Sequence, residues 1–138
     1  MVSGSKAAER PWLPRPGLVL LVGLGGAIGT AARYAVAEAR PPVDGWPVAT
    51  LVVNLVGSFA LGLLLELLAG RDATLGAERV RAALGTGLLG GFTTYSAFAV
   101  ETERMLADGH LALAGAYVGA SLIGGLVAAA AGAVVGGA

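Results

Sequence analysis

Apolar residues dominate four stretches of the chain, and short polar connections separate these stretches. Each stretch is close to the ~20 residues that an α-helix needs to cross the ~30 Å hydrocarbon core of a bilayer. The pattern therefore predicts an all-α membrane protein whose transmembrane domain, residues 17–138, contains four helices. The predicted helices cover about residues 17–37, 47–69, 80–106 and 111–135. Residues 1–16, which precede them and are rich in proline, are predicted to form a flexible tail.

The composition agrees with a membrane location and argues against several classes of function. Hydrophobic residues make up 56% of the chain and charged residues 13%, whereas a soluble domain carries about 25% charged residues. The chain has no cysteine and a single histidine, His110, so disulfides and clusters of Cys or His metal ligands are excluded. The sequence offers no nucleophile–base pair, which argues against an enzyme. No basic block indicates nucleic-acid binding.

Basic residues are distributed unequally between the two sides of the predicted bundle. With the N-terminus inside, six Lys and Arg residues lie on the cytoplasmic side and three on the other, which satisfies the positive-inside rule. The cytoplasmic residues are Lys6, Arg10, Arg15, Arg71, Arg79 and Arg81, and the opposite ones are Arg33, Arg40 and Arg104. Basic residues before an apolar stretch are also typical of a signal peptide, but no clear A-x-A cleavage site follows. The bias favours the N-in orientation and still permits a mixed one.

The run "GLGGAIGTAARY", residues 23–34, contains several glycines. Ile28 takes the place of the last glycine in G-x-G-x-x-G, and no predicted strand precedes the run, so a dinucleotide site is not supported. Gly25 and Gly29 form a G-x-x-x-G face for close helix packing. Arg33, near the end of this helix, is either a snorkelling anchor or a positive charge at a vestibule that gathers anions.

Polar residues follow one face of the second predicted helix. Thr50, Asn54 and Ser58 are spaced i, i+4, i+8, so they lie on the same side of the helix. A single buried amide is explained by hydrogen bonding between helices, which contributes about 0.6 kcal/mol on average. An aligned stripe is better explained by a polar pathway. Tyr117 and Ser121 repeat the i, i+4 spacing in the fourth helix.

The stretch "GGFTTYSAFAVE", residues 90–101, is poor material for a continuous helix in lipid. Each glycine costs a helix about 0.8–1 kcal/mol relative to alanine, and β-branched threonines add to the cost. A break here would release backbone groups, which the bilayer tolerates only where protein or a polar cavity satisfies them. No acid or base precedes Glu101 in this stretch. We therefore expect a passive site made of dipoles rather than a proton relay.

With these motifs assembled, the chain resembles the fluoride channel family (Fluc, also called CrcB) over about residues 18–135. The matching runs are "GGAIGTAARY", "NLVGSFALG" and especially "GGFTTYSAFAVE", which is similar to the family signature G-G-[FL]-T-T-F-S-T-F. The resemblance implies four-helix subunits that pair antiparallel as a dual-topology dimer in the bacterial inner membrane. It also implies a third helix broken mid-membrane and a structural sodium ion at the dimer centre. The implied sodium ligands are backbone carbonyls of Gly90 and Thr93.

The resemblance further implies a fluoride-selective passive channel that lowers cytoplasmic fluoride. The implied fluoride-pathway residues are Asn54, Tyr95, Phe98, Thr50, Tyr117 and Ser121. Arg33 and Glu101 match charged positions at a vestibule or a helix end. The partners expected from the resemblance are fluoride, sodium, membrane lipid and a second subunit.

Two residues depart from the family pattern. Tyr95 stands where the family usually has phenylalanine, and Ala97 stands where threonine is common. Since some family members work only as heterodimers, the second subunit is either another copy of this chain or a paralogue. The rival interpretations are a small proton-coupled multidrug-type transporter and a non-transporting membrane adaptor. The transporter needs a membrane-embedded carboxylate, whereas the first helix has none before Glu38 at its end.

Overall fold

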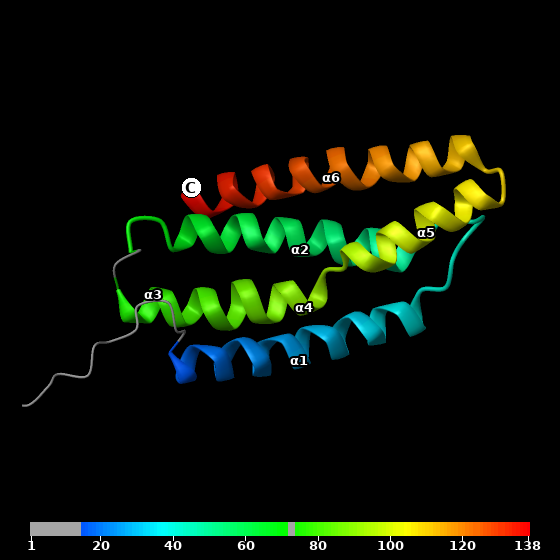
Figure 1. Ribbon diagram of the computed structural model, residues 1–138. Coiled ribbons are helices and arrows are strands. Elements are labelled where there is room, and N and C mark those ends of the chain that lie inside the picture. Colours follow the sequence, from blue (N-terminus) through cyan, green and yellow to red (C-terminus); the bar gives the residue numbers. More distant parts are fainter. Residues whose placement is uncertain (1–14, 72–73) are drawn as a thin grey trace, which may run out of the picture.

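The computed structural model describes residues 15–71 and 74–138, and every regular element within these two ranges is helical. Of the tail predicted over residues 1–16, only Arg15 and Pro16 are described; the remainder lies outside the described residues. Figure 1 shows the helices side by side along one common direction, as in a bundle.

Three long helices account for most of the bundle. They are α1 (Pro16–Ala39), α2 (Val48–Leu67) and α6 (Leu111–Gly137), with 24, 20 and 27 residues. At ~1.5 Å per residue they measure about 36, 30 and 40 Å, so each can cross a bilayer. Among the described residues, these three are long and apolar enough to be membrane spans. Each end of these three helices lies within two residues of its predicted position.

The third predicted helix consists of consecutive pieces. They are α3 (Leu75–Val80), η1 (Arg81–Leu89), α4 (Gly90–Phe92) and α5 (Tyr95–Ala107). The first three form one rod, in which η1 has the wider turns of a π-helix. The rod begins before the predicted start because the Thr74 hydroxyl accepts the Ala77 N–H at 3.2 Å and caps the first turn. A break at Thr93 and Thr94 separates the rod from α5.

The helices form two closely packed pairs. α1 packs against η1 and α4, and α2 packs against α6 along most of its length (Figure 1). Glycines make both contacts tight: a Cβ atom on Gly29 would collide with the backbone of Leu88, and one on Gly132 with the backbone of Phe59. Backbone-to-backbone packing of this kind is how small residues stabilise helix pairs in a membrane.

A tight turn over residues 43–46 joins α1 to α2 at one end of the bundle. Val43 and Trp46 exchange both backbone hydrogen bonds, at 3.1 and 2.8 Å. Asp44 and Gly45 between them have φ angles of 49° and 81°. Positive φ at both central positions is the requirement of a type I′ turn, which Asp-Gly favours. The turn fixes where Trp46 lies relative to the helices.

The buried core lies at this same end. Met105, Ala114 and Tyr117 are buried together, with Trp46 and Phe98 packed against them. The Trp46 and Tyr117 rings meet edge to face with centroids 6.3 Å apart, an arrangement that aromatic pairs prefer. The core therefore anchors α5, α6 and the turn to one another beside the break.

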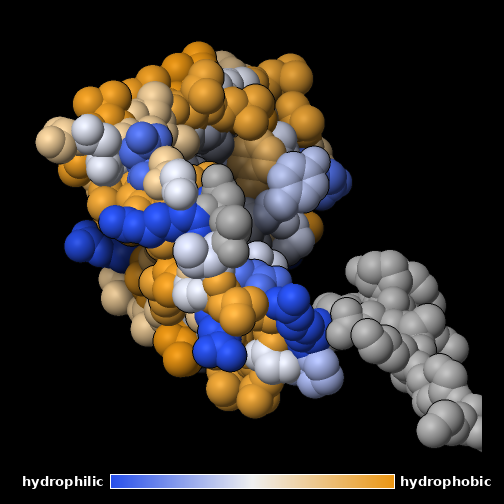
Figure 2. Space-filling model, turned by 90° about the vertical axis from the view of Figure 1, so that its left-hand side faces the viewer, coloured by the Kyte–Doolittle hydropathy of each residue, from blue (hydrophilic) through white to orange (hydrophobic). Residues whose placement is uncertain are grey.

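Figure 2 shows the opposite end of the bundle, where α1 and α3 begin and α6 finishes. Hydrophilic residues cross this end, and hydrophobic residues surround them on the sides. Arg15 pairs here with Glu78 at 2.7 Å. Arg71 donates to the Leu67 carbonyl at 2.6 Å, near the C-terminus of α2, where a cation is favourable for the helix dipole. Polar ends and apolar sides are the pattern expected of a bundle that spans a bilayer.

Candidate functional site

The candidate site is the break between α4 and α5. Thr93 and Thr94 have extended backbones, with φ, ψ of −78°, 162° and −149°, 118°. Gly90 and Gly91 remain helical, so the threonines rather than the glycines leave the helix. The methyl group of Thr93 fills the space that a Cβ atom on Gly57 of α2 would occupy. The β-branched side chain is thus seated against a glycine of the neighbouring helix.

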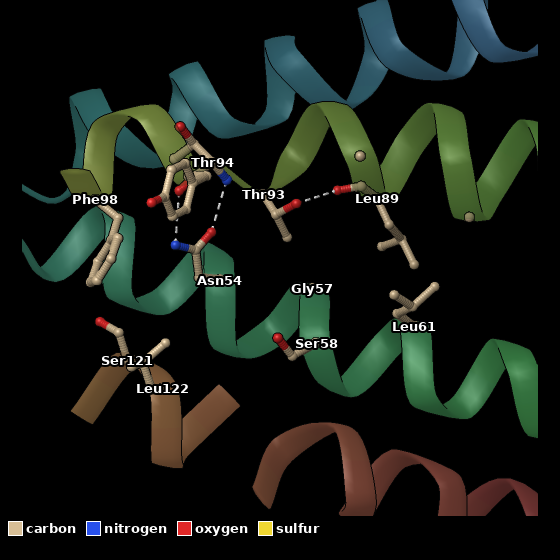
Figure 3. Close-up of a pocket in the computed structure, with 13 residues that line it drawn as sticks. Asn54, Gly57, Ser58, Leu61, Leu89, Thr93, Thr94, Phe98, Ser121 and Leu122 are labelled. Atoms are coloured by element: carbon tan, nitrogen blue, oxygen red, sulfur yellow. Dashed lines mark hydrogen bonds between the residues drawn. The ribbon is translucent and has the colours of Figure 1, made fainter. Parts of the chain in front are cut away.

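Asn54 of α2 binds the backbone of the break with both ends of its amide. Its Nδ2 donates to the Thr94 carbonyl at 3.0 Å, and the Thr94 N–H donates to its Oδ1 at 2.8 Å. Figure 3 draws both bonds and shows Asn54 pointing from α2 toward the break. An unpaired backbone group buried away from water costs about 1–3 kcal/mol. Asn54 therefore replaces hydrogen bonds that the helix loses at Thr94.

The other side of the break is bound from α1. Arg33 is half-buried, and its Nε donates to the Gly91 carbonyl at 3.2 Å. The Thr30 hydroxyl donates to the same carbonyl at 3.5 Å. Side chains of two different helices thus satisfy the backbone on the two sides of the break.

The Gly90 and Thr93 carbonyls are among those at the break that lose the donors of a continuous helix. The N–H of Thr94, which would bond the Gly90 carbonyl, donates to Asn54 instead. The N–H of Ala97, which would bond the Thr93 carbonyl, donates to the Thr94 hydroxyl at 3.2 Å and caps α5. Backbone carbonyls are suitable ligands for a small hard cation. Gly90 and Thr93, the predicted sodium ligands, therefore have carbonyl oxygens without these helical donors.

A groove of ≈ 360 Å³ lies beside the break, between α2, η1, α5 and α6. Most of its lining is apolar, and Figure 3 shows Asn54 at its polar side and Phe98 pointing toward Ser121 of α6. Six of the predicted site residues line it: Asn54, Gly90, Thr93, Tyr95, Phe98 and Ser121. The structure thus brings together residues from positions 54 to 121 of the chain.

Thr50, Glu101 and Tyr117 form a second polar group next to the groove. The Thr50 hydroxyl donates to Glu101 Oε1 and the Tyr117 hydroxyl to Oε2, both at 2.7 Å. Thr50 and Tyr117 are buried, with 7% and 0% of their surface exposed, and Glu101 is half-buried. The carboxylate predicted to mark a helix end therefore lies between α2 and α6, where it accepts hydrogen bonds from two hydroxyl groups.

Aromatic rings connect the second polar group to the groove. Phe98 lies 5.4 Å from Tyr117 and 6.0 Å from Tyr95, measured between ring centroids. Tyr95 is 81% exposed, so its ring lies at the open side of the groove. The rings of Tyr117, Phe98 and Tyr95 thus lead from the buried polar group to the surface.

Sequence reasoning missed three contributors to the site. Thr30 was not singled out because a lone threonine in an apolar helix has no periodic partner. Trp46 lies in a turn, although the Asp-Gly pair before it is a known turn signal. Gly57 stands next to the polar stripe in sequence, but its contact with the Thr93 methyl group depends on the fold and has no sequence signal.

Comparison with known proteins places this chain in a family. The profile of the family described as "CrcB-like protein, Camphor Resistance (CrcB)" matches residues 20–133. The chain belongs to the CrcB family. The matched part contains the break, the groove and the second polar group. Together with the long apolar helices, membership of the CrcB family makes the chain a multi-pass membrane protein.

Individual relatives agree with this membership. The chain is 46% identical over 119 residues to "Fluoride-specific ion channel FluC 2" of Leifsonia xyli, covering 86% of this chain and 82% of that protein. It is 48% identical over 117 residues to "Fluoride-specific ion channel FluC 1" of Cutibacterium acnes, covering 83% and 82%. A third relative, "Fluoride-specific ion channel FluC" of Chlorobium chlorochromatii, is 44% identical over 111 residues, covering 80% and 84%.

Proposed function

We propose that this chain is a subunit of a passive, fluoride-selective channel of the bacterial inner membrane that lowers cytoplasmic fluoride. The observation that carries the proposal is the groove at the break. Its described lining combines the Asn54 amide, hydroxyl groups and aromatic rings, and contains no Lys, Arg, Asp or Glu. The printed names of the relatives support the same ion. A channel needs no nucleophile or catalytic metal, so the chain is not an enzyme in this proposal.

The lining suits a small, strongly hydrated anion. Fluoride gives up water only where other donors replace it, and it leaves only where those donors are weak. The Asn54 amide has two N–H groups, and one of them is used on Thr94. The second is the donor that we assign to fluoride in the groove. A fixed Lys or Arg there would hold the anion too tightly for conduction.

The second polar group extends the pathway. The hydroxyls of Thr50 and Tyr117 donate to Glu101, and a hydroxyl can rotate to a new acceptor. In this proposal, a passing fluoride replaces the Glu101 carboxylate as the acceptor of these two hydroxyl groups. Ser121, whose Oγ is buried, supplies a further hydroxyl between this group and the groove. The positive edges of the Tyr95 and Phe98 rings face the anion between the polar steps.

A sodium ion bound to the carbonyls of Gly90 and Thr93 is the cofactor in this proposal. The lost helical donors support it, because the Thr94 and Ala97 N–H groups bond elsewhere. The ion would supply positive charge at the end of the α4 rod, where the helix dipole is negative. It is structural and takes no part in a chemical step.

The functional unit in this proposal is an antiparallel dimer, formed either by two copies of this chain or with a paralogue. The groove and the exposed Tyr95 ring support a second subunit, because a complete pathway needs a wall on the open side. The numbers in the names FluC 2 and FluC 1 support the paralogue. The unequal distribution of basic residues supports it as well, because one orientation is favoured.

The test is fluoride efflux from liposomes that contain the purified protein, with the external ion read by an electrode. We expect fast fluoride efflux and no chloride efflux. Protein-free liposomes and liposomes with the Phe98→Ile variant are the controls. If the chain is silent alone, the measurement is repeated with the paralogue encoded by the same organism. Silence in both preparations would contradict the proposal.

The same liposomes separate the channel from the small multidrug-type transporter. That transporter requires proton exchange at an embedded carboxylate, and Glu101, which lies half-buried between α2 and α6, would be that carboxylate. Proton-coupled uptake of a cationic drug without fluoride efflux would replace the channel by this alternative.

A further inference from the structure

The contact between Arg33 and the break differs from both roles expected of this residue. An anchor or a vestibule charge would direct the guanidinium to water or lipid headgroups. Arg33 is instead half-buried, with Nε on the Gly91 carbonyl at 3.2 Å. The Thr30 hydroxyl reaches the same oxygen at 3.5 Å. Thr30 lies one helical turn before Arg33, so both residues use the same face of α1.

The backbone around Gly91 leaves little room for movement. A Cβ atom on Gly91 would collide with the Gly26 carbonyl of α1. The two backbones are therefore in direct contact, and Arg33 and Thr30 bind α4 further along the same face of α1. On the far side of the break, Asn54 fixes Thr94 from α2. Side chains of α1 therefore bind the break at Gly91, and a side chain of α2 binds it at Thr94.

These contacts divide four of the carbonyls at the break into two sets. The Gly91 and Thr94 oxygens accept hydrogen bonds from side chains. The helical donors for the Gly90 and Thr93 oxygens bond elsewhere. A guanidinium on the Gly91 oxygen also makes that oxygen a poor cation ligand, because its lone pairs are engaged by a positive donor.

We propose that Arg33 is a positioning residue for the cation site: its Nε, with the Thr30 hydroxyl, holds the Gly91 carbonyl and thereby leaves the neighbouring Gly90 carbonyl to the ion. This inference rests on the sodium ion of the proposed function. In this inference, Arg33 holds the backbone of the break in place and does not serve to attract anions. The inference also assigns a role to Thr30.

Two substitutions separate a donor from a charge at this position. In Arg33→Gln, the Nε2 atom follows Cδ, as Nε does in arginine, so a donor remains where the charge is lost. Arg33→Ala removes both. Arg40→Ala is the matched control, because Arg40 is an exposed arginine at the end of the same helix. Thr30→Val keeps the shape of the side chain and removes only its hydroxyl.

The measurement is the thermal midpoint of detergent-purified protein titrated with sodium chloride, with choline chloride holding the ionic strength constant. Arg33→Ala is expected to raise the sodium concentration for half-maximal stabilisation about tenfold, which corresponds to ~1.4 kcal/mol. Arg33→Gln and Thr30→Val are expected to raise this sodium concentration by no more than about threefold. Arg33→Gln keeps a neutral donor for the Gly91 carbonyl, and Thr30→Val keeps Arg33 itself. Arg40→Ala is expected to match the unaltered chain.

The outcomes distinguish this inference from the proposal on which it rests. An unaltered chain that conducts fluoride but shows no sodium-dependent midpoint would overturn both the sodium ion and the inference. A sodium-dependent chain in which Arg33→Gln behaves like Arg33→Ala would overturn the inference alone, because the charge and not the donor would then matter. If Arg33→Ala does not fold, Arg33→Leu takes its place. A folded Arg33→Leu protein with an unchanged sodium concentration for half-maximal stabilisation would overturn the inference. If Arg33→Leu also fails to fold, an unchanged sodium concentration in both Thr30→Val and Arg33→Gln supports the retained donor.

Discussion

Asn54 and Thr94 are paired through four polar groups, two on each residue: the Thr94 N–H donates to Oδ1 at 2.8 Å, and Nδ2 donates to the Thr94 carbonyl at 3.0 Å. A side-chain amide has the same donor and acceptor as a peptide group. Asn54 therefore takes the place of a neighbouring strand for one residue of extended backbone. This pairing explains how a break can persist inside an apolar bundle, where unsatisfied backbone groups are costly.

The first prediction concerns this pairing. Asn54→Leu leaves both Thr94 groups unpaired, and we expect it to lower the free energy of unfolding by about 2–4 kcal/mol and to abolish fluoride efflux. Asn54→Asp keeps the acceptor and loses the donor, so its stability and fluoride efflux are expected to lie between those of Asn54→Leu and the unaltered chain. Thermal midpoints in detergent and liposome efflux are the measurements. Ser58→Ala, at the next polar position on the same helix face, is the control. An Asn54→Leu protein as stable as the Ser58→Ala protein would show that the break does not need the amide.

The second prediction concerns Glu101, which accepts hydrogen bonds from hydroxyl groups of two helices at once. Thr50→Val or Tyr117→Phe alone leaves the carboxylate with one donor, whereas the double variant leaves it half-buried with neither. We therefore expect the double variant to lose more stability than the sum of the two single variants, by about 0.5–1 kcal/mol. The double-mutant cycle is measured by unfolding in detergent. Because both single variants can also alter packing, the same cycle in a Glu101→Gln background is the control, and the excess is expected to shrink there. Simple additivity in the unaltered background would mean that Glu101 does not couple the two hydroxyls.

The third prediction concerns the ring that lines the groove between Tyr95 and Tyr117. Phe98→Ile keeps an apolar side chain and removes the ring edge, so we expect fluoride efflux to fall at least about tenfold while the protein keeps its assembly. Leu122→Ile is the matched control, because Leu122 also lines the groove and is 63% exposed. Size-exclusion chromatography follows assembly, and the fluoride electrode follows flux. Equal flux in both variants would remove the ring from the pathway.

The fourth prediction concerns the close contact of α1 with η1 and α4. A methyl group on Gly29 collides with the Leu88 backbone, whereas a Cβ atom on Gly23 meets nothing within 4 Å. Gly29→Ala is therefore expected to lower the free energy of unfolding by about 1–3 kcal/mol. Gly23→Ala, on the same helix, is expected to change it by less than about 1 kcal/mol, and in the stabilising direction. The comparison uses thermal midpoints in one detergent. Equal midpoints would show that the α1 contact adjusts without cost.

Much of the bundle could be predicted because helix length in a membrane is set by bilayer thickness. The ends of α1, α2 and α6 follow from where apolar residues stop. The start of the interrupted helix was missed by five residues, Leu75 against position 80, because a threonine cap outweighed the polar composition around it. A local hydrogen bond of this kind leaves no periodic signal.

The break itself was predicted from the glycines and threonines of residues 90–94 together, and the structure assigns it to the threonines. Gly90 and Gly91 stay helical, and Gly91 serves the contact with Gly26. The extended residues are the threonines that follow, held by Asn54 and by the seat at Gly57. Propensity marks residues that tolerate a break, whereas partners on other helices decide where it forms.

The polar stripe on α2 was predicted as one face with one role, and the structure divides it. Thr50 donates to Glu101, Asn54 binds Thr94, and Ser58 lines the groove. Periodicity establishes that side chains share a face. It cannot assign their partners, which here come from α5 and from the break.

The last prediction concerns orientation in the membrane. The C-terminus, Ala138, and the start of α1 lie at the same end of the bundle (Figure 1). The arginines of this end are Arg15 at the start of α1, Arg71 just after α2 and Arg79 in α3. The positive-inside rule therefore places Ala138 in the cytoplasm. The chain has no cysteine, so a single cysteine at either end reports its own accessibility. In intact cells we expect a membrane-impermeant maleimide to label Ala107→Cys, which is exposed at the opposite end, and to spare Ala138→Cys until the cells are permeabilised.

The control for orientation removes basic residues without touching the site. Arg71→Ala with Arg79→Ala reduces the balance from six against three to four against three, so labelling of both cysteines in intact cells is expected to become more equal. A fixed orientation in the unaltered chain requires an oppositely oriented paralogue for an antiparallel dimer. Equal labelling of the two cysteines in the unaltered chain would contradict the prediction, and it would make two copies of this chain sufficient for the dimer.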